Sequence, residues 1–366
     1  MTTNMNEKLQ RLSKKLKDQK VDTFLISNYY SIYYLSGFKG AVSEDREVYL
    51  VYSKKKLNLV APRLYQEEAK ALSSKDLKVF ITSERDKLLA TATDLLDAKQ
   101  TVGFESEDLK YKEYEETRLL LKEKKLISLE NLVLGIREIK TGEEISLIRK
   151  AQEITYKALK KVLPLIKEGI TEKEISEKLR LSMLSLGAES ESFGSIVAAN
   201  KGSALPHYET SNKKIKNGDM ILIDWGAKYK GYCGDSTRVI FLKKVPGDTV
   251  ANVYNLVLKA QEKAINGLKA GMTGSEGYDM ANKVFVENKV EKYFTHGLGH
   301  GIGLAVHEEP YLRKTVEKPL LEGSVFSVEP GLYFTKWGGI RIEDLVALRA
   351  DKAEVLGSYP KEIVIL

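Results

Sequence analysis

The side chains best suited to chemistry lie in the second half of the chain, where histidines gather in a glycine-rich stretch. Of the four histidines, His296, His300 and His307 fall within one short segment, and His207 lies farther upstream. Glycine occupies every second position from 297 to 303. This spacing makes a helix improbable and indicates a backbone that approaches another segment closely.

Four acidic residues interrupt or end apolar runs that are predicted to be strands. Asp224 lies in the run 220–226 and Asp235 in the run 232–242, which should pair as a hairpin around a turn at 228–231. Glu329 ends a third run. Glu343 follows Arg341 by two positions, so both side chains should share one face of a strand at 340–346. Acids embedded in strands are unfavourable unless they are paired or bind a metal.

Each of these residues alone has an ordinary structural explanation. A single strand aspartate is most often a turn or salt-bridge residue, and a single histidine is most often a core or surface group. Four such acids together with clustered histidines are hard to explain in this way, so the pattern predicts one site. Carboxylate-rich ligands are typical of sites for manganese, cobalt, iron or zinc ions and not of a closed structural zinc site.

The charge of the acids predicts the number of ions. Four carboxylates around one divalent ion would leave about two negative charges uncompensated in a partly dry cavity. Two ions would neutralise them. The sequence therefore predicts a pair of metal ions, about 3.5 to 4 Å apart if the carboxylates bridge them.

The first 131 residues should form an α/β domain with a central sheet, because candidate helices alternate with short β-branched runs. These runs are 23–26, 48–52, 57–61, 79–82, 101–104 and 126–129. The region has no histidine, no cysteine and no glycine-rich phosphate loop. We therefore expect it to serve in scaffolding, capping or dimerisation, with the domain boundary at about residues 132–140.

The second domain, residues 137–366, should open on a long amphipathic helix, because Thr141 and Glu144 form a capping box ahead of periodic apolar residues. This domain also contains a short internal repeat, called here the sequence echo. The phrase Ala-Gln-Glu at 151–153 recurs at 260–262, and each copy precedes a glycine stop and a threonine helix cap. Duplicated halves would explain the echo, although short phrases also recur by chance.

The composition is that of a globular protein of two domains, with 366 residues, 43% hydrophobic and 30% charged. The net charge is +7, but the lysine runs lie among acids without interleaved aromatic residues, so no nucleic-acid partner is expected. No apolar stretch suits a signal peptide or a membrane span. The single cysteine, Cys233, excludes an internal disulfide and is expected to be a small buried residue; we expect a cytoplasmic protein without membrane contact.

Taken together, these motifs resemble the Xaa-Pro aminopeptidase and prolidase branch of the creatinase and methionine aminopeptidase superfamily. The resemblance rests on 204–207, 224–226, 231–238, 296–304, 307–308, 328–331 and 339–344, and more weakly on 34–38. It implies a creatinase-type N-terminal α/β domain followed by a pita-bread catalytic domain. It also implies a homodimer.

The resemblance assigns roles to individual residues. It implies that the metal ligands are Asp224, Asp235, His300, Glu329 and Glu343, with Asp235 and Glu343 bridging two ions. It implies that His207 and His307 contact substrate and stabilise the tetrahedral intermediate, and that His296 supports the site. Arg341 should pair with a ligand carboxylate. A metal-bridging hydroxide would then attack the scissile carbonyl, with Glu329 relaying its proton to the leaving proline nitrogen.

We therefore expect an Xaa-Pro aminopeptidase that acts on peptides with proline in second position, with Mn²⁺ as the foremost metal and Co²⁺, Zn²⁺ or Fe²⁺ as alternatives. The surroundings of His207 favour this form. The alternative is prolidase, which accepts only dipeptides, and Arg313 could bind the substrate carboxylate that prolidase requires. A non-catalytic pita-bread binding protein is less expected because all five ligand positions are present. The large N-terminal domain disfavours methionine aminopeptidase, and the complete ligand set disfavours creatinase.

Overall fold

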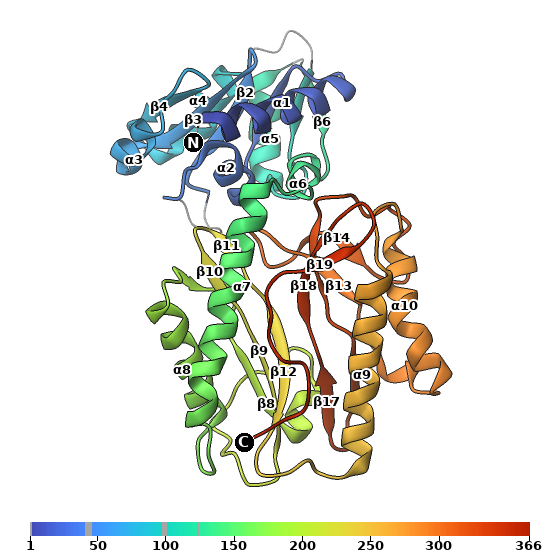
Figure 1. Cartoon of the computed structure of the whole chain (residues 1–366). Helices are drawn as coiled ribbons and strands as arrows, with labels where there is room; N and C mark the ends of the chain where they lie inside the picture. Colours follow the sequence, from blue (N-terminus) through green and yellow to red (C-terminus); the bar gives the residue numbers. More distant parts are fainter. Residues whose placement is uncertain (1, 41–45, 97–100, 123) are drawn as a thin grey trace. The chain divides into compact units, whose positions relative to one another are not determined.

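The computed structural model describes residues 2–40, 46–96, 101–122 and 124–366. The chain divides into two compact units, residues 1–137 and 138–366 (Figure 1). The first unit ends with helix α6 (Leu132–Arg137).

A six-stranded mixed sheet forms the centre of the first unit. Its strands are β1 (Thr23–Ile26), β2 (Tyr49–Ser53), β3 (Lys56–Pro62), β4 (Leu77–Thr82), β5 (Thr101–Phe104) and β6 (Lys125–Ser128), in the order β4-β3-β2-β1-β5-β6. All six predicted strands are present, with ends shifted by no more than two residues. The α/β class predicted for this unit is confirmed.

Helices cover this sheet and complete its core. They are α1 (Thr2–Asp18), α2 (Tyr29–Ser36), α3 (Gln66–Ala71), α4 (Leu88–Asp94), α5 (Tyr111–Leu121) and α6, with 3-10 turns η1 (Arg63–Tyr65) and η2 (Arg85–Lys87). Leu88 and Ala92 of α4 pack with Leu25, Val51 and Val60 of the sheet in one buried cluster. The packing of apolar side chains between helix and sheet therefore stabilises this unit.

Two helix pairs flank the strands of the second unit (Figure 1). Helices α7 (Gly142–Val162) and α8 (Glu172–Ser185) lie on one side, and α9 (Asp248–Gly267) and α10 (Gly274–Glu287) lie on the other. The predicted capping box of Thr141 and Glu144 begins α7. Thr171 and Thr273 cap α8 and α10 in the same way.

Short strands make up several small sheets between these helices. Their bounds are β7 (Ser190–Glu191), β8 (Ile196–Ala199), β9 (Met220–Trp225), β10 (Ala227–Tyr229), β11 (Tyr232–Cys233), β12 (Ser236–Phe241), β13 (Gly299–Gly301), β14 (Glu308–Leu312), β15 (Val325–Val328), β16 (Gly331–Phe334), β17 (Gly338–Arg341), β18 (Asp344–Leu348), β19 (Ala353–Val355) and β20 (Val364–Ile365). The sheet orders are β11-β10-β7, β20-β12-β9-β8, β14-β13-β15-β18-β19 and β16-β17. Three 3-10 turns, η3 (Leu163–Leu165), η4 (Asn200–Ala204) and η5 (Glu291–Tyr293), connect these elements.

Strand β9 lies between two hydrophobic cores, which explains its continuous apolar sequence. Ile221 and Ile223 belong to the core of α7 and α8, whereas Met220 and Leu222 belong to the core of α9 and α10. Because side chains alternate along a strand, Asp224 shares the face of Met220 and Leu222. One core for each helix pair supports the two halves that the sequence echo suggests.

The predicted hairpin of 220–226 with 232–242 is present but interrupted. β9 pairs antiparallel with β12, whereas β10 pairs with β11 and with β7 of a separate sheet. Asp235 therefore lies in the break before β12 rather than within a strand. The hydroxyl of Ser192 lies 3.0 and 2.9 Å from the carbonyl oxygens of Ala227 and Gly234 and ties the two strands together at this break.

The segment 325–348, which carries Glu329 and Glu343, forms a second hairpin that is interrupted in the same way. β15 pairs with β18 and β16 pairs with β17, so Glu329 follows β15 and Glu343 precedes β18. The predicted strand 340–346 is thus broken at 342–343, where the chain passes from one sheet to another. The N–H groups of the two acids bond outside these ladders, to the carbonyl oxygens of Leu298 at 2.8 Å and Thr237 at 3.2 Å. Of the four acids, only Asp224 lies inside a strand.

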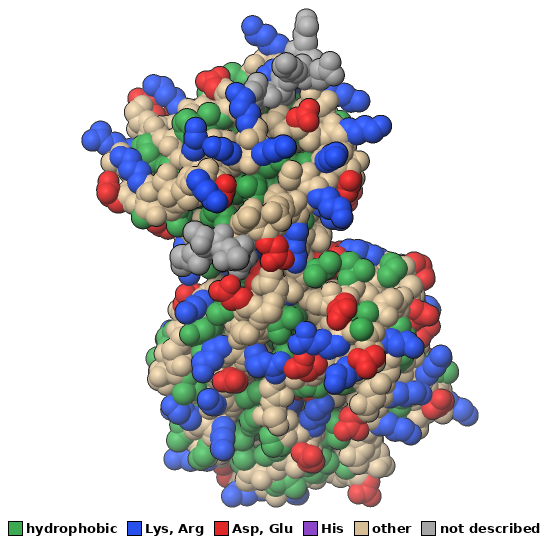
Figure 2. All heavy atoms as spheres, turned by 45° about the horizontal axis from the view of Figure 1, so that its top comes forward, with side chains coloured by type: hydrophobic (Ala, Val, Ile, Leu, Met, Phe, Trp, Pro, Cys, Tyr) green, Lys and Arg blue, Asp and Glu red, His purple; other side chains and the backbone are tan. Residues whose placement is uncertain are grey.

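Charged side chains of both signs are interspersed over the face of the second unit visible in Figure 2, as is typical of a solvated surface. In the lysine run at 213–216, Lys213 donates to the carbonyl oxygen of Ala199 at 2.6 Å and thus has a structural contact. Helices of the described residues are all too short or too polar to cross a bilayer.

The glycine spacing around His300 does reflect a close backbone approach. A side chain at Gly299 of β13 would overlap the carbonyl oxygen of Ser327 in β15. We therefore expect Gly299→Ala to destabilise the second unit by about 1–3 kcal/mol, because the added methyl group forces these strands apart. Urea unfolding would measure this loss.

The matched control is Gly142→Ala in the first turn of α7. No atom lies within 4 Å of the position that its added Cβ would take, and alanine favours a helix more than glycine does. This variant should be at least as stable as the native protein. Equal stability of the two variants would contradict the close approach at Gly299.

Candidate metal centre

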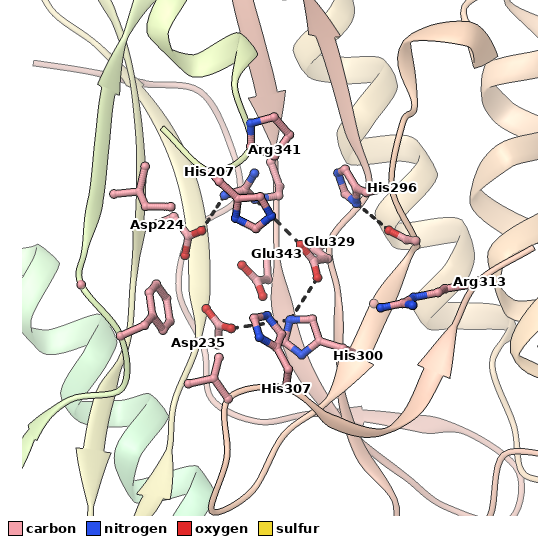
Figure 3. A pocket seen from close by; sticks show the side chains of 17 residues that line it. His207, Asp224, Asp235, His296, His300, His307, Arg313, Glu329, Arg341 and Glu343 are labelled. Atoms are coloured by element: carbon pink, nitrogen blue, oxygen red, sulfur yellow. Dashed lines mark hydrogen bonds and ion pairs between the residues drawn. The ribbon is translucent and has the colours of Figure 1, made fainter. Parts of the chain in front are cut away.

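One cavity of the second unit, of about 410 Å³, brings the predicted site residues together (Figure 3). The cavity is lined by His207, Asp224, Asp235, His296, His300, His307, Glu329, Arg341 and Glu343. Arg313 and the apolar side chains of Phe193, Ile196 and Val306 also line it. These residues come from both interrupted hairpins and from two loops, so the tertiary fold is what assembles them.

Arg341 is the cation that lies among the acids. Its Nη2 donates to Oδ2 of Asp224 at 2.5 Å, and its Nε lies 3.9 Å from Oε2 of Glu329. The same Nε donates to the hydroxyl of Thr237 at 2.9 Å, and that hydroxyl donates to Oε2 of Glu343 at 2.6 Å. Arg341 therefore connects acids of both hairpins.

His300 directs its Nε2 toward two carboxylates. Its Nδ1 lies 3.1 Å from the carbonyl oxygen of Gly301, and because a carbonyl only accepts, Nδ1 carries the proton. Its Nε2 lies 3.2 Å from Oε1 of Glu329 and 3.9 Å from Oδ2 of Asp235. A proton or a metal ion must therefore lie between this nitrogen and the acids.

The contact between His300 and Glu329 shifts the pKa of both groups. Burial lowers the pKa of His300, but the hydrogen bond and charge of Glu329 outweigh it and raise the pKa above its usual value. Burial by itself raises the pKa of Glu329, but the hydrogen bond and charge of His300 lower that pKa to about 2. In the metal-free site this pair thus favours an imidazolium beside a carboxylate.

The pKa values of the other three acids are raised, whereas that of Glu329 is lowered. Burial, followed by the charges of neighbouring carboxylates, raises the pKa of Asp235 and of Glu343 well above the ordinary range. Burial also raises the pKa of Asp224, although the charge of Arg341 opposes this effect. Ionising all four acids together is therefore unfavourable without further positive charge.

The donor atoms fit a divalent metal ion. Oδ1 of Asp224 and Oδ1 of Asp235 are buried without a hydrogen-bond partner among the described residues. One ligand atom from each of Asp235, His300 and Glu343 lies within 4.8 Å of the others. Buried carboxylate oxygens without a donor are unfavourable unless a cation binds them, and carboxylates with one imidazole suit manganese, cobalt, iron or zinc.

The remaining histidines reach this cluster from separate segments (Figure 3). The ring of His307 lies against that of His300, with centroids 4.3 Å apart. Burial, and then the charge of His300, lowers the pKa of His307, so it is neutral at neutral pH. His207 lies between η4 and β9, and the hydroxyl of the next residue, Tyr208, donates to the buried carboxylate of Glu172 at 3.0 Å.

Tyr333 is a site residue that the sequence analysis missed. Its hydroxyl accepts from Nη1 of Arg341 at 2.9 Å and lies 2.8 Å from Nε2 of His296. Nδ1 of His296 donates to the carbonyl oxygen of Gly297 at 2.6 Å, so Nε2 accepts from the tyrosine. Tyr333 therefore holds His296 and Arg341 in fixed orientations.

Ser327 and Thr237 are also missing from the predicted set. The hydroxyl of Ser327 donates to Oε1 of Glu329 at 3.0 Å, and Thr237 bonds Glu343 as described. Each lies two positions from an acid of the same segment, Glu329 or Asp235. Strand alternation was the available signal, because residues two apart share a face.

Comparisons with known proteins agree with this geometry. Residues 146–350 match the metallopeptidase family M24, and residues 8–139 match the creatinase/prolidase N-terminal domain. An Xaa-Pro dipeptidase from Pyrococcus horikoshii is 34% identical over 360 residues, which cover 98% of this chain and 99% of that relative.

Solved structures are similar over nearly the full chain. A structure of an Xaa-Pro dipeptidase from Bacillus anthracis is 35% identical, has a TM-score of 0.92 and matches over 99% of this chain and 100% of its own. A structure of an X-Pro aminopeptidase from Thermotoga maritima is 35% identical, has a TM-score of 0.88 and matches over 98% and 99%. The chain belongs to metallopeptidase family M24, in its creatinase and prolidase branch of hydrolases with the pita-bread fold.

Proposed function

We propose that the enzyme is an Xaa-Pro dipeptidase, which hydrolyses the bond before the proline of a two-residue substrate. The observation that carries this proposal is Arg313, which lines the same cavity as the acids. Its guanidinium carbon lies 4.2 Å from the ring centre of Tyr311, and the guanidinium is directed toward the cluster in Figure 3. A dipeptide presents a carboxylate just beyond the scissile bond, and arginine binds carboxylates through paired N–H groups.

The names of the relatives favour this choice over the aminopeptidase that the sequence led us to expect. Both the Pyrococcus horikoshii and the Bacillus anthracis relatives are Xaa-Pro dipeptidases. The similar X-Pro aminopeptidase from Thermotoga maritima keeps aminopeptidase activity as the second candidate. Both activities use the same bond chemistry and differ in what lies beyond the proline.

The residues that would hold two divalent ions are Asp224, Asp235, His300, Glu329 and Glu343. The unpartnered oxygens of Asp224 and Asp235 and the inward-directed Nε2 of His300 support this set. Four ionised carboxylates balance the charge of two divalent ions. Mn²⁺ is the proposed metal, with Co²⁺, Zn²⁺ or Fe²⁺ as alternatives, because carboxylate oxygens dominate the set.

The bound ions would polarise the scissile carbonyl and lower the pKa of a water molecule at the site. Glu329 would carry a proton to the leaving nitrogen of the proline, with its carboxylate oriented by Ser327 and His300. Neutral His307 would donate an N–H to the developing oxyanion. His207 would contact the substrate.

The first unit is proposed to serve in capping or dimerisation rather than in chemistry. Among the described residues, the group that meets metal-ligand geometry lies in the second unit. A homodimer is part of this proposal, and light scattering of the full chain would measure the oligomeric state.

Arg313→Met should remove the preference for dipeptides, because the proline carboxylate would lose its charged partner. We expect kcat/KM for Gly-Pro to fall on the order of 100-fold, as when one partner of a charged hydrogen-bonded pair is lost. The amide Gly-Pro-NH₂ has no carboxylate, so its kcat/KM should change little. Steady-state kinetics on both substrates measures the difference.

The control for this variant is Lys314→Met, which removes the neighbouring exposed cation and should alter neither rate. If Arg313→Met lowered kcat/KM equally for the dipeptide and the amide, Arg313 would be excluded as the partner of the substrate carboxylate. A native enzyme that prefers Arg-Pro-Pro to Gly-Pro would establish the aminopeptidase instead.

Metal ions should stabilise the protein more strongly as the pH rises. In metal-free protein, the raised pKa values of Asp235 and Glu343 mean that their stabilising contribution is present below the usual carboxyl pKa and is lost as the pH rises through the raised values. Metal binding needs the ionised acids and so reverses this loss. The gap in unfolding temperature between Mn²⁺-loaded and EDTA-treated protein should widen from about pH 5 to about pH 8.

Glu343→Gln should make this gap smaller and less dependent on pH, because one of the two titrating acids is then absent. A gap that is constant with pH in the native protein would contradict the proposed competition between protons and metal ions. Differential scanning calorimetry at matched ionic strength provides the measurement.

Tyr333→Phe should lower kcat or Mn²⁺ affinity by about 10- to 100-fold, the usual effect of losing a residue that orients metal ligands. The reason is that Arg341 and His296 both lose their bond to the hydroxyl. The control is Tyr254→Phe, which removes another hydroxyl bond, to the carbonyl oxygen of Lys361 at 2.7 Å. Kinetics and titration calorimetry that show the same effect for both variants would count against an orienting role for Tyr333.

A further inference from the structure

His307 lies at the end of a short irregular loop, residues 302–307, between β13 and β14. Its side chain is exposed at the cavity, whereas the side chain of the next residue, Glu308, is buried. Successive side chains point to opposite sides where a strand begins. The placement of His307 therefore depends on how Glu308 is held inside the protein.

Glu308 is held by an ion pair in the interior. Its Oε1 lies 2.9 Å from Nζ of Lys140, and each side chain is only 2% exposed. Its Oε2 accepts a long hydrogen bond of 3.4 Å from the N–H of Ala305, within the same loop. A side chain at Gly303 would collide with this carboxylate. The loop is thus folded around the carboxylate of Glu308.

Lys140 is itself fastened to the strand that leads to the acids. Its N–H donates to the carbonyl oxygen of Gly323 at 2.9 Å, and the preceding residue, Ile139, forms an antiparallel bridge with Ser324. These contacts lie directly before β15, which ends at Glu329. The ion pair therefore ties the His307 loop to the strand that carries one of the proposed ligands.

Stability alone does not explain an ion pair at this depth. The cost of removing both charges from water offsets their attraction, and a pair of apolar side chains in such a place is often as stable or more stable. What a buried ion pair adds is a fixed position, because the carboxylate is stable in the interior only beside its cation. A fixed position matters where a neighbouring group must be placed accurately.

We propose that Lys140 is a positioning residue for His307 and acts through Glu308. The inference rests on the oxyanion role proposed for His307. His307 directly precedes Glu308, so fixing Glu308 also fixes the backbone that carries the imidazole of His307. This imidazole lies beside His300. Since Lys140 contacts none of the proposed metal ligands, its loss should affect turnover rather than metal binding.

A double-mutant cycle of Lys140→Met with His307→Ala tests this. In the native background, Lys140→Met should lower kcat for Gly-Pro by about 10- to 100-fold, as misplaced catalytic groups do. In the His307→Ala background the same change should have less than about a 2-fold effect, because the group that Lys140 positions is already absent. Mn²⁺ affinity, measured by titration calorimetry, should stay within about 2-fold throughout.

Two further variants keep the result interpretable. Lys140→Met leaves a buried carboxylate without its cation, so Lys140→Met/Glu308→Gln serves in the cycle if the single variant does not fold, because it leaves no unpaired charge. Arg149→Met is the matched control. It removes a half-exposed ion pair with Glu354, whose carboxylate keeps Arg349 as a partner, and should change kcat little.

The outcomes separate this inference from the proposed function. Equal losses from Lys140→Met in both backgrounds, or an equal loss from Arg149→Met, would overturn the positioning role while leaving the function of His307 intact. An unchanged kcat in His307→Ala would overturn the role of His307 and this inference with it. A loss confined to the background that contains His307, with Mn²⁺ affinity unchanged, is the expected result.

Discussion

The close approach of four carboxylates is the constraint on which the second unit depends. Charges gathered away from water repel one another strongly, and burial raises the cost of ionising each of them. Arg341 relieves only part of this repulsion, because it brings one positive charge to four carboxylates. The strands that carry the acids must therefore be held together by interactions outside the site, and the site itself requires further cations.

The two halves of the second unit supply that external support in the same way. In the first half, Gln152 of α7 bonds both the N–H and the carbonyl oxygen of Asp235, at 3.0 and 2.9 Å. In the second half, Gln261 of α9 donates at 2.8 Å to the carboxylate of Asp344, the neighbour of Glu343. These glutamines are the central residues of the phrase that recurs in the sequence. The echo thus marks the contact by which the first helix of each half fixes an acid-bearing segment.

The sequence predicted what depends on local pattern. The strands of the first unit and the threonine caps follow from alternation and capping chemistry within a few residues, and both are present. The breaks beside Asp235 and Glu343 could not be predicted, because each arises where the chain passes between two sheets. Tyr333 was missed because its place in the site also depends on strand pairing. It faces the site because β16 pairs with β17, which places Tyr333 opposite Gly339 and on the face of Arg341.

The choice between dipeptidase and aminopeptidase could not come from the acids, since both activities need the same ligands. It depends on β14. His307 directly precedes this strand, Arg313 directly follows it, and both line the cavity. The same short strand thus carries the proposed oxyanion donor and the proposed partner of the substrate carboxylate. Because Glu308 anchors β14 from the interior, the ion pair with Lys140 fixes the strand whose two ends carry these proposed groups.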